Sequence, residues 1–220
     1  MVKRRKVSNL LGLAVLSTLM TRPMYPYEVA SSLRARGKDD DMAIKWGSLY
    51  RVVQNLEKYG FVEAVHSERQ GARPERTVYR ITEAGRAELV DWVRELVGET
   101  QREESRFKAG LSVLSVLSPD EAVELLRTRA GALEERIAVA EAELAEQAGQ
   151  IPRLFLIETE YELAVRTAEL RWARGLADEI AEGSFPGLEI WREFHRTGDV
   201  PPDLAELAER GPAPKRRSPE

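Results

Sequence analysis

IKWGSLYRVVQNLEKYGFVEA, residues 44–64, changes its hydrophobic period within one short stretch of chain. Its first part has helical spacing, carried by four apolar residues: Leu49, Val52, Val53 and Leu56. Gly60 follows, and glycine is typical of a helix C-terminus. FVEAVH, 61–66, then alternates with the period of a half-buried strand. The stretch therefore predicts a short helix that begins near Gly47 or Ser48 and leads directly into a strand.

Two more helices are expected before this stretch. The apolar run LLGLAVLSTLM, 10–20, follows Ser8 and Asn9, either of which can cap a helix. YEVASSLRARG, 27–37, has apolar residues at helical spacing and ends at a glycine. The first run resembles a secretory signal after KRRK, but it lacks a small-residue cleavage site and is too short to span a bilayer. We therefore expect a buried core helix there.

A second strand is expected at TVYRI, 77–81, after the polar loop SERQGARPER, 67–76. This loop is too long for a tight turn, so the hairpin should project with a basic tip. Three short helices followed by such a hairpin form a winged helix-turn-helix. In that arrangement the third helix exposes polar side chains that reach the base edges of DNA.

The same residues resemble a known family. GSLYRVVQNLEKYGFVEA (47–64) and RPERTVYRITEAGRAEL (73–89) are similar to the signature of PadR-like transcriptional regulators. LLGLAVLSTL and YPYEVASSL are similar to that family's first two helices, so the resemblance covers residues 9–90. The chain departs from the pattern at Arg51, where a proline commonly follows the tyrosine, and at Tyr25-Pro26, where His-Gly is usual. The resemblance implies a regulator of transcription, and its longer members dimerise through a C-terminal helical region.

The rest of the sequence predicts long helices. Thr82 should cap a helix at 83–97 that carries Leu89, Trp92, Val93 and Leu96 on one side, and another helix should span 106–117. Ser118-Pro119-Asp120-Glu121 is typical of a helix start, and that helix extends to about Gly149. A second long helix is expected at 153–182. The two stripes either pack on each other within one chain or form a dimer interface, with these dimerisation candidates: Leu126, Leu133, Ile137, Leu163 and Leu170.

The expected fold class is mainly α with a small β-wing. An N-terminal winged helix-turn-helix DNA-binding domain, 1–97, precedes a helical domain of long antiparallel helices, 98–190. The second domain is the dimerisation domain that the resemblance implies. Residues 191–220, which end in GPAPKRRSPE, are expected to be a poorly ordered tail.

The charge is unevenly distributed along the chain. The net charge is −4, yet residues 1–85 carry 15 lysines and arginines against 9 aspartates and glutamates, and the remainder carries 18 against 28. A basic first part favours a polyanionic partner. We therefore expect double-stranded DNA, a promoter operator, as the partner of the N-terminal domain. The alternative is a winged helix that binds proteins without DNA, which the overall acidic charge favours and the basic wing disfavours.

Candidate DNA contacts fall into three groups. In the wing, Arg69, Arg73 and Arg76 are candidates for phosphate or minor-groove contacts. On the third helix, Ser48, Arg51 and Asn55 are the base-edge candidates. The Tyr50 hydroxyl is a candidate donor to a phosphate, and the alternative is a ring that packs under the wing. Lys45 is either a DNA contact or an ordinary surface lysine. Tyr27 lies where the second helix would cross the backbone. KRRK at 3–6 is either a minor-groove arm or a solvated end.

Other functions find little support. The chain has no cysteine, and His66 and His195 are isolated, so neither a metal site nor a cofactor is expected. No nucleophile–base pattern or phosphate-binding loop indicates an enzyme. In PadR-like regulators an aromatic-lined cavity can accept a flat apolar effector, and the resemblance makes Trp92 a candidate contact; the alternative is a core or interface tryptophan. The expectation is a cytoplasmic homodimeric repressor of a palindromic operator, released by a small aromatic effector.

Overall fold

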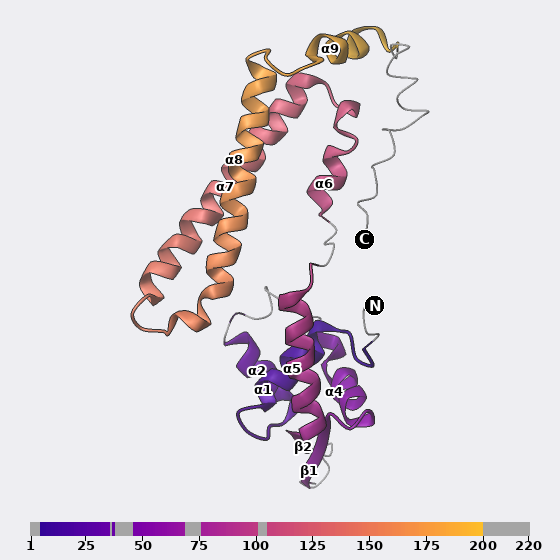
Figure 1. Cartoon of the computed structure of the whole chain (residues 1–220), viewed down its shortest axis with the longest axis vertical. Coiled ribbons are helices and arrows are strands. Elements are labelled where there is room, and N and C mark those ends of the chain that lie inside the picture. The colour runs from indigo at the N-terminus through magenta and orange to yellow at the C-terminus, as the bar shows by residue number, and fades with distance from the viewer. Residues whose placement is uncertain (1–4, 36, 38–45, 69–75, 101–104, 200–220) are drawn as a thin grey trace, which may run out of the picture. The chain divides into compact units, whose positions relative to one another are not determined.

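The computed structural model of the chain describes residues 5–35, 37, 46–68, 76–100 and 105–199. The chain separates into two compact units, residues 1–103 and 104–220 (Figure 1). Each unit has its own cluster of buried apolar side chains. The fold is mostly helical with one small antiparallel sheet, which confirms the fold class predicted from the sequence.

The N-terminal unit contains four α-helices among its described residues: α1 Leu10–Leu19, α2 Pro26–Arg34, α4 Leu49–Lys58 and α5 Glu83–Gly98. A 3-10 turn, Trp46–Ser48, leads into α4. Asn9 caps α1 by accepting a hydrogen bond from the Leu11 amide at 2.8 Å. Thr82 caps α5 in the same way, through the Gly85 amide at 3.0 Å. Both caps satisfy amides that a helix N-terminus leaves without partners.

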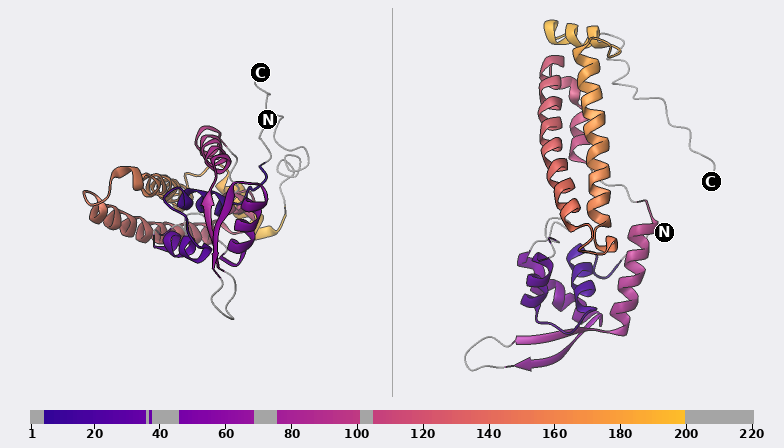
Figure 2. Two further views of the ribbon diagram at one scale, coloured as in Figure 1. Left: turned by 90° about the horizontal axis from the view of Figure 1, so that it is seen from below. Right: turned by 90° about the vertical axis from the view of Figure 1, so that its left-hand side faces the viewer.

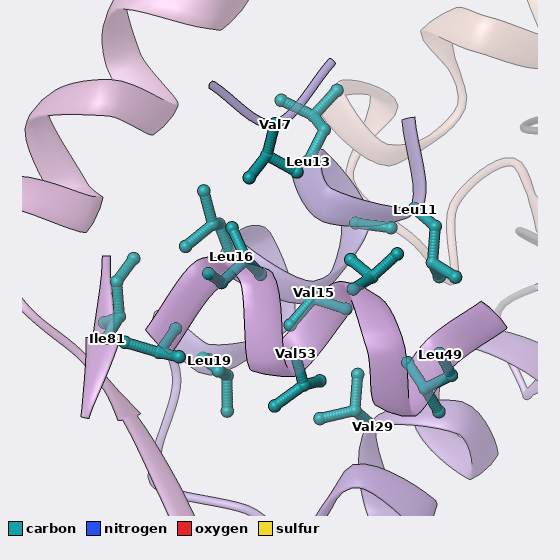
Figure 3. Close-up of a cluster of buried hydrophobic side chains, with 14 of the residues drawn as sticks. Val7, Leu11, Leu13, Val15, Leu16, Leu19, Val29, Leu49, Val53 and Ile81 are labelled. Carbon is teal, nitrogen blue, oxygen red and sulfur yellow. The ribbon is translucent and has the colours of Figure 1, made fainter. Parts of the chain in front are cut away.

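The core of this unit surrounds α1 (Figure 3). Val15 and Leu16 are fully buried at its centre. Leu56 of α4 is also fully buried. α1 buries almost its whole circumference, because the other helices of the unit and the sheet pack around it. The stripe expected on α5 is only half right. Leu89 and Trp92 are buried, whereas Val93 and Leu96 are 43% and 38% exposed.

The two strands, β1 Val62–Glu68 and β2 Arg76–Ile81, form an antiparallel hairpin that projects from the helices of the N-terminal unit (Figure 2). Val62 pairs with Ile81, and the register shifts between Ala64 and His66. The base of the hairpin is fixed to the α1–α2 loop by two backbone hydrogen bonds between Met24 and Tyr79, at 2.9 and 3.0 Å.

The C-terminal unit is built on two long helices that lie side by side, α7 Pro119–Gln147 and α8 Ile157–Ala181 (Figure 1). The predicted start of α7 is confirmed, because the Ser118 hydroxyl accepts a hydrogen bond from the Glu121 amide at 3.3 Å. Shorter elements surround the pair: α6 Arg106–Leu111 and the 3-10 turns Leu114–Val116 and Arg153–Phe155. Phe107 of α6 packs edge-on against Trp172 of α8, with ring centroids 5.9 Å apart.

A further helix, α9 Leu188–Thr197, lies where the sequence favoured a poorly ordered tail from residue 191. Gly187 and Gly198 adopt positive φ at its two ends, which suits glycine. Leu188 is buried in the apolar cluster of this unit, and the Trp191 indole donates to the Leu117 carbonyl oxygen at 2.9 Å. These contacts stabilise a helix that is too short to be stable alone. Residues 200–220 lie outside the described residues.

Candidate nucleic-acid interface

The helix α4 presents two different polar flanks. Its buried stripe faces the core and comprises Leu49, Val52, Val53 and Leu56. Tyr50 is 62% exposed on one flank, and Arg51 and Asn55 are exposed on the other. At 3.6 residues per turn, Tyr50 and Asn55 are about 140° apart around the helix axis. The predicted base-edge and backbone candidates on α4 therefore do not form one cluster.

Ser48 occupies the N-cap position of α4, as predicted, and is partly buried. Its hydroxyl does not cap the helix, because its backbone is already helical, with φ −98° and ψ −5°. A side-chain cap requires extended backbone at this position. The 3-10 turn that precedes α4 explains this conformation.

The Tyr50 flank is the one nearer the wing. Glu57 lies seven residues after Tyr50 and so on the same side of α4, and it accepts a hydrogen bond from the Tyr79 hydroxyl of β2 at 3.3 Å. Burial raises the pKa of Tyr79, and the neighbouring Glu57 carboxylate raises it further. Tyr79 therefore stays protonated and keeps this hydrogen bond between the wing and α4.

The start of α2 is fixed by two polar contacts. The Tyr25 amide donates to the Glu28 carboxylate at 2.8 Å, and Arg22 Nη2 donates to the same carboxylate at 3.0 Å. The first of these contacts is the main cause that lowers the pKa of Glu28. Tyr27 is 48% exposed and its ring stacks on Tyr25 with centroids 5.4 Å apart. A stacked ring holds the Tyr27 hydroxyl in one direction at the helix start.

The structure describes the position of only one of the three candidate wing arginines. Arg76 begins strand β2, while Lys45, Arg69 and Arg73 lie outside the described residues. On the strands themselves Arg80 pairs with Glu63 across the hairpin, with Nη2 2.6 Å from Oε1. This exposed pair holds the two strands together on one face of the wing.

On the other flank of α4 a groove of about 350 Å³ separates the helix from the N-terminal segment. The groove is lined by residues of both: Lys6, Val7, Ser8, Asn9, Ser48, Arg51, Val52 and Asn55. The sequence did not predict that residues 6–9 lie beside α4. The basic run KRRK at 3–6 indicates either a minor-groove arm or a solvated end, and neither predicts contacts of residues 6–9 with the groove.

The proposed effector contact, Trp92, is 3% exposed. Its ring packs beside Gly12 of α1, and the Arg5 guanidinium lies over it at 5.4 Å from the ring centroid. The structure thus places Trp92 in the core of the N-terminal unit, the alternative weighed for it from the sequence.

The dimerisation candidates differ in exposure. Leu126 and Leu133 are 3% and 7% exposed within a single chain, while Ile137, Leu163 and Leu170 are half-buried. Leu126 packs with Ala173, Ala177 and Ile180 of α8. Two ion pairs, Arg129–Glu169 and Arg174–Glu134, also join α7 to α8. The α7–α8 pair therefore buries much of its stripe by itself.

An exposed apolar stripe remains on α8. Tyr161, Val165 and Trp172 are 68%, 46% and 49% exposed and recur at intervals of four and seven residues. This spacing puts them on one side of the helix.

Within the described residues, no group of three or more histidine, aspartate or glutamate side chains could hold a metal ion. The helices of that same part of the chain include none long and apolar enough to cross a membrane.

Comparison with known proteins supports this interpretation of the N-terminal unit. Residues 15–91 match the model of the transcriptional regulator PadR-like family. Over 78% of its length the chain is similar in structure to Bacillus subtilis PadR in complex with operator DNA, with 19% identity, a TM-score of 0.61 and coverage of 99% of that chain. A comparison with curated proteins gives no match.

Two other similar structures differ from this complex, one in its bound ligand and one in its role. One is Bacillus subtilis PadR in complex with p-coumaric acid, with 18% identity, a TM-score of 0.62, and coverage of 78% of this chain and 99% of that chain. The other is the Vibrio cholerae virulence activator AphA, with 22% identity, a TM-score of 0.60, and coverage of 79% and 99%. At these identities the likeness establishes a shared fold.

Proposed function

This chain belongs to the PadR-like transcriptional regulators, and from that premise we propose that it is a homodimeric repressor that binds a palindromic operator through its N-terminal unit. Members of this family are DNA-binding regulators of transcription and not enzymes. The observation that carries the proposal is the placement of α4: one side is locked into the core, and both flanks expose polar side chains. A helix of this kind can enter the major groove and read base edges.

Two elements beside α4 support the DNA-binding role. The Tyr27 end of α2 and the wing both approach α4 from the Tyr50 side, because Met24, Tyr79 and Glu57 link the α1–α2 loop, β2 and α4. Tyrosine hydroxyls are good donors to phosphate oxygens. We assign Tyr27, Tyr50 and the wing arginines Arg69, Arg73 and Arg76 to the DNA backbone, and Ser48, Arg51 and Asn55 to base edges. Lys45 joins the first group.

A dimer suits this mode of binding, because two recognition helices read two half-sites about 34 Å apart. The burial of Leu126 and Leu133 within one chain moves the proposed interface to surfaces that the chain leaves exposed. The stripe Tyr161, Val165 and Trp172 on α8 is such a surface, and aromatic residues are enriched at protein interfaces. We therefore place the dimer contact there. Leu163 and Leu170 lie about 140–180° around α8 from this stripe, so with Ile137 of α7 they remain candidates for a separate contact.

A small aromatic effector is part of the same proposal. The similar PadR structure with p-coumaric acid supports this ligand class for the fold. In this chain Trp92 is covered by Arg5 and lies in the core, so an effector reaches the ring only when the N-terminal segment moves.

The proposal is tested by selecting binding sites from a random duplex library with the full-length protein. A symmetric consensus with half-sites about 10 bp apart is the expected result, because each protomer of a dimer reads one half. Binding to the selected duplex should fall steeply between 50 and 200 mM salt. Failure to enrich any sequence, with no salt-dependent binding, would instead favour the winged helix that binds proteins without DNA.

Whether the protein represses or activates transcription is tested separately, because AphA, which shares the fold, is a virulence activator. A reporter promoter that carries the selected site should be silenced when the protein is expressed. Increased transcription from the same promoter would make the protein an activator.

A further inference from the structure

Arg5 is a buried cation that is held by carboxylates of α5. Its side chain is 4% exposed, although it lies only five residues from the chain start. Nη1 donates to Glu88 and Nη2 to Glu95, each at 2.6 Å, and Asp91 is 3.5 Å from Nη2. These three carboxylates lie along one side of α5. Burial lowers the pKa of Arg5, but the hydrogen bonds to Glu88 and Glu95 leave it raised overall.

The next residues are held as well. Val7 is 8% exposed in the core of the unit, and its Cγ1 lies so close to Gly12 that a Cβ there would be 2.8 Å away. Asn9 caps α1. With alternate residues 5, 7 and 9 fixed, Lys6 and Ser8 between them are both exposed. The N-terminal segment, residues 5–9, is thus attached to the helices of its unit at three points.

Lys6 and Ser8 open onto the groove beside α4 that also contains Arg51 and Asn55. The side chains of Lys6, Arg51 and Asn55 make no hydrogen bond or ion pair with any other described residue. The start of α1 faces the same segment and adds a partial positive charge. Two cations without a partner among the described residues, together with a helix N-terminus along one groove, favour an anion as the ligand of this groove.

A helix in the major groove has a phosphate backbone on each side. The groove is about 12 Å wide and a helix with its side chains is about 10–12 Å across, so both flanks lie near phosphates. On the Tyr50 flank, α2 and the wing supply the contacts of the proposed function, because internal hydrogen bonds hold them on that side of α4. On the Arg51–Asn55 flank the described chain offers the N-terminal segment.

We propose that the N-terminal segment is a further DNA-binding element, in which Lys6 contacts a backbone phosphate on the Arg51–Asn55 side of α4 and Arg5 is the positioning residue. Arg5 touches no DNA in this arrangement. It acts by joining the segment to Glu88 and Glu95, which replaces a flexible arm with a fixed one. The inference rests on the proposed function and adds a second phosphate-contacting element, on the opposite side of α4 from the wing.

The direct test is Lys6→Met in the full-length protein, with the duplex selected by the wild type as the probe. Loss of one phosphate contact should reduce the slope of log K against log salt by about one unit and weaken binding about fivefold at 0.15 M salt. The effect should be equal for selected and scrambled duplexes, since phosphates carry no sequence information. Lys108→Met, which removes an exposed lysine of the other unit, is the matched control and should change neither quantity.

The positioning role is tested by the pair Glu88→Gln/Glu95→Gln. This variant makes the protein more positive by two charges, so net charge alone would strengthen DNA binding. Release of Arg5 predicts the opposite, a weaker complex in which adding Lys6→Met has less effect than in the wild type. The exposed pair Glu135→Gln/Glu143→Gln changes the net charge equally and should not weaken binding. Circular dichroism and thermal melts establish that each variant is folded at the assay temperature.

The outcomes separate the inference from the proposed function. Suppose that the wild type binds its selected duplex with a steep salt dependence and that Lys6→Met has the same salt slope and affinity. This result overturns the Lys6 contact and leaves the proposed function intact. Stronger binding by Glu88→Gln/Glu95→Gln, as in its charge control, overturns the positioning role of Arg5. A wild type that binds no DNA overturns both the inference and the proposed function.

Discussion

Gly85 of α5 lies directly against the backbone of Phe61: a Cβ atom built at position 85 would be 2.0 Å from the Phe61 carbonyl oxygen. The same oxygen accepts a hydrogen bond from the Thr82 amide at 3.0 Å, and Thr82 also caps α5 through the Gly85 amide. The close approach therefore fixes α5 against the residue that immediately precedes β1 of the wing. It couples the helix that carries Trp92, Glu88 and Glu95 to the hairpin.

Gly85→Ala should destabilise the N-terminal unit by at least about 2 kcal/mol, because the added methyl group overlaps backbone and not a flexible side chain. Gly98→Ala is the matched control on the same helix, since a Cβ there meets no atom within 4 Å. Alanine at that helical position should be neutral or slightly stabilising. Urea unfolding of both variants measures the difference; equal midpoints would show that α5 can shift away from Phe61.

The two flanks of α4 should differ in what they read. Asn55→Ala should weaken binding to the selected duplex by about 1–3 kcal/mol and relax the preference at one base position, because a paired base edge is lost. Tyr50→Phe should weaken all duplexes alike, because a hydroxyl–phosphate bond carries no sequence information. Competition with single-base variants of the site measures both effects. Uniform weakening by Asn55→Ala would remove it from the base-reading set.

The local pattern predicted α4, the hairpin and α7 because each has a strong period or a cap within a few residues. Leu49 to Leu56 recur at helical spacing, and Ser118 caps α7. The Arg5 contacts could not be predicted in this way, because they join residues 83 and 90 positions apart in sequence. No period links a single arginine near the chain start to a helix after the wing.

The same limit explains the dimerisation candidates and α9. A stripe such as Leu126 and Leu133 has the same spacing whether it packs on α8 of its own chain or on a partner. Only the structure shows that the chain already covers it. Exposed residues such as Val165 lie among more polar neighbours in the sequence than the buried stripe does. Their apolar periodicity is therefore a weaker sign of an interface. α9 depends on Trp191 reaching the Leu117 carbonyl, a contact between distant segments.

The wing arginines should act through phosphates. Arg73→Ala and Arg76→Ala are each expected to reduce the salt slope by about one unit and to weaken selected and scrambled duplexes equally. Arg153→Ala, which removes an exposed ion pair with Glu160 in the other unit, is a suitable control. Titrations at several salt concentrations give the slopes. If neither variant changes its slope, the wing tip makes no phosphate contact.

The proposed dimer should depend on the exposed stripe of α8. Val165→Glu should produce a monomer in light scattering, because it places a charge within an apolar interface, and should bind the palindromic duplex weakly. Val116→Glu alters a valine that is 73% exposed elsewhere in the same unit and should remain a dimer. A chain that ends at residue 110 should also be monomeric. A dimer in that truncated chain would move the interface to the N-terminal unit.

The last prediction concerns the effector and follows from the cover over Trp92. In the free protein the 3% exposure of Trp92 should protect its fluorescence from acrylamide, because the ring is packed between α1 and Arg5. Subtracting the spectrum of Trp92→Phe isolates this signal from those of the other three tryptophans of the chain. After a planar aromatic acid such as p-coumaric acid is added, the fluorescence of Trp92 should decrease only slowly in the wild type, because the ring is covered. It should do so readily in Glu88→Gln/Glu95→Gln, where Arg5 is released.

Coupling to DNA binding then has a defined size. A tenfold loss of affinity for the selected duplex requires about 1.4 kcal/mol of coupling free energy between the two ligands. By reciprocity, the bound duplex must lower the affinity of the protein for p-coumaric acid by the same factor. If the acid quenches Trp92 and leaves DNA affinity unchanged, the ring is a binding site without a regulatory role. If the acid quenches Trp92 in neither protein, Trp92 serves only the core, because the variant removes the cover that would otherwise exclude the ligand.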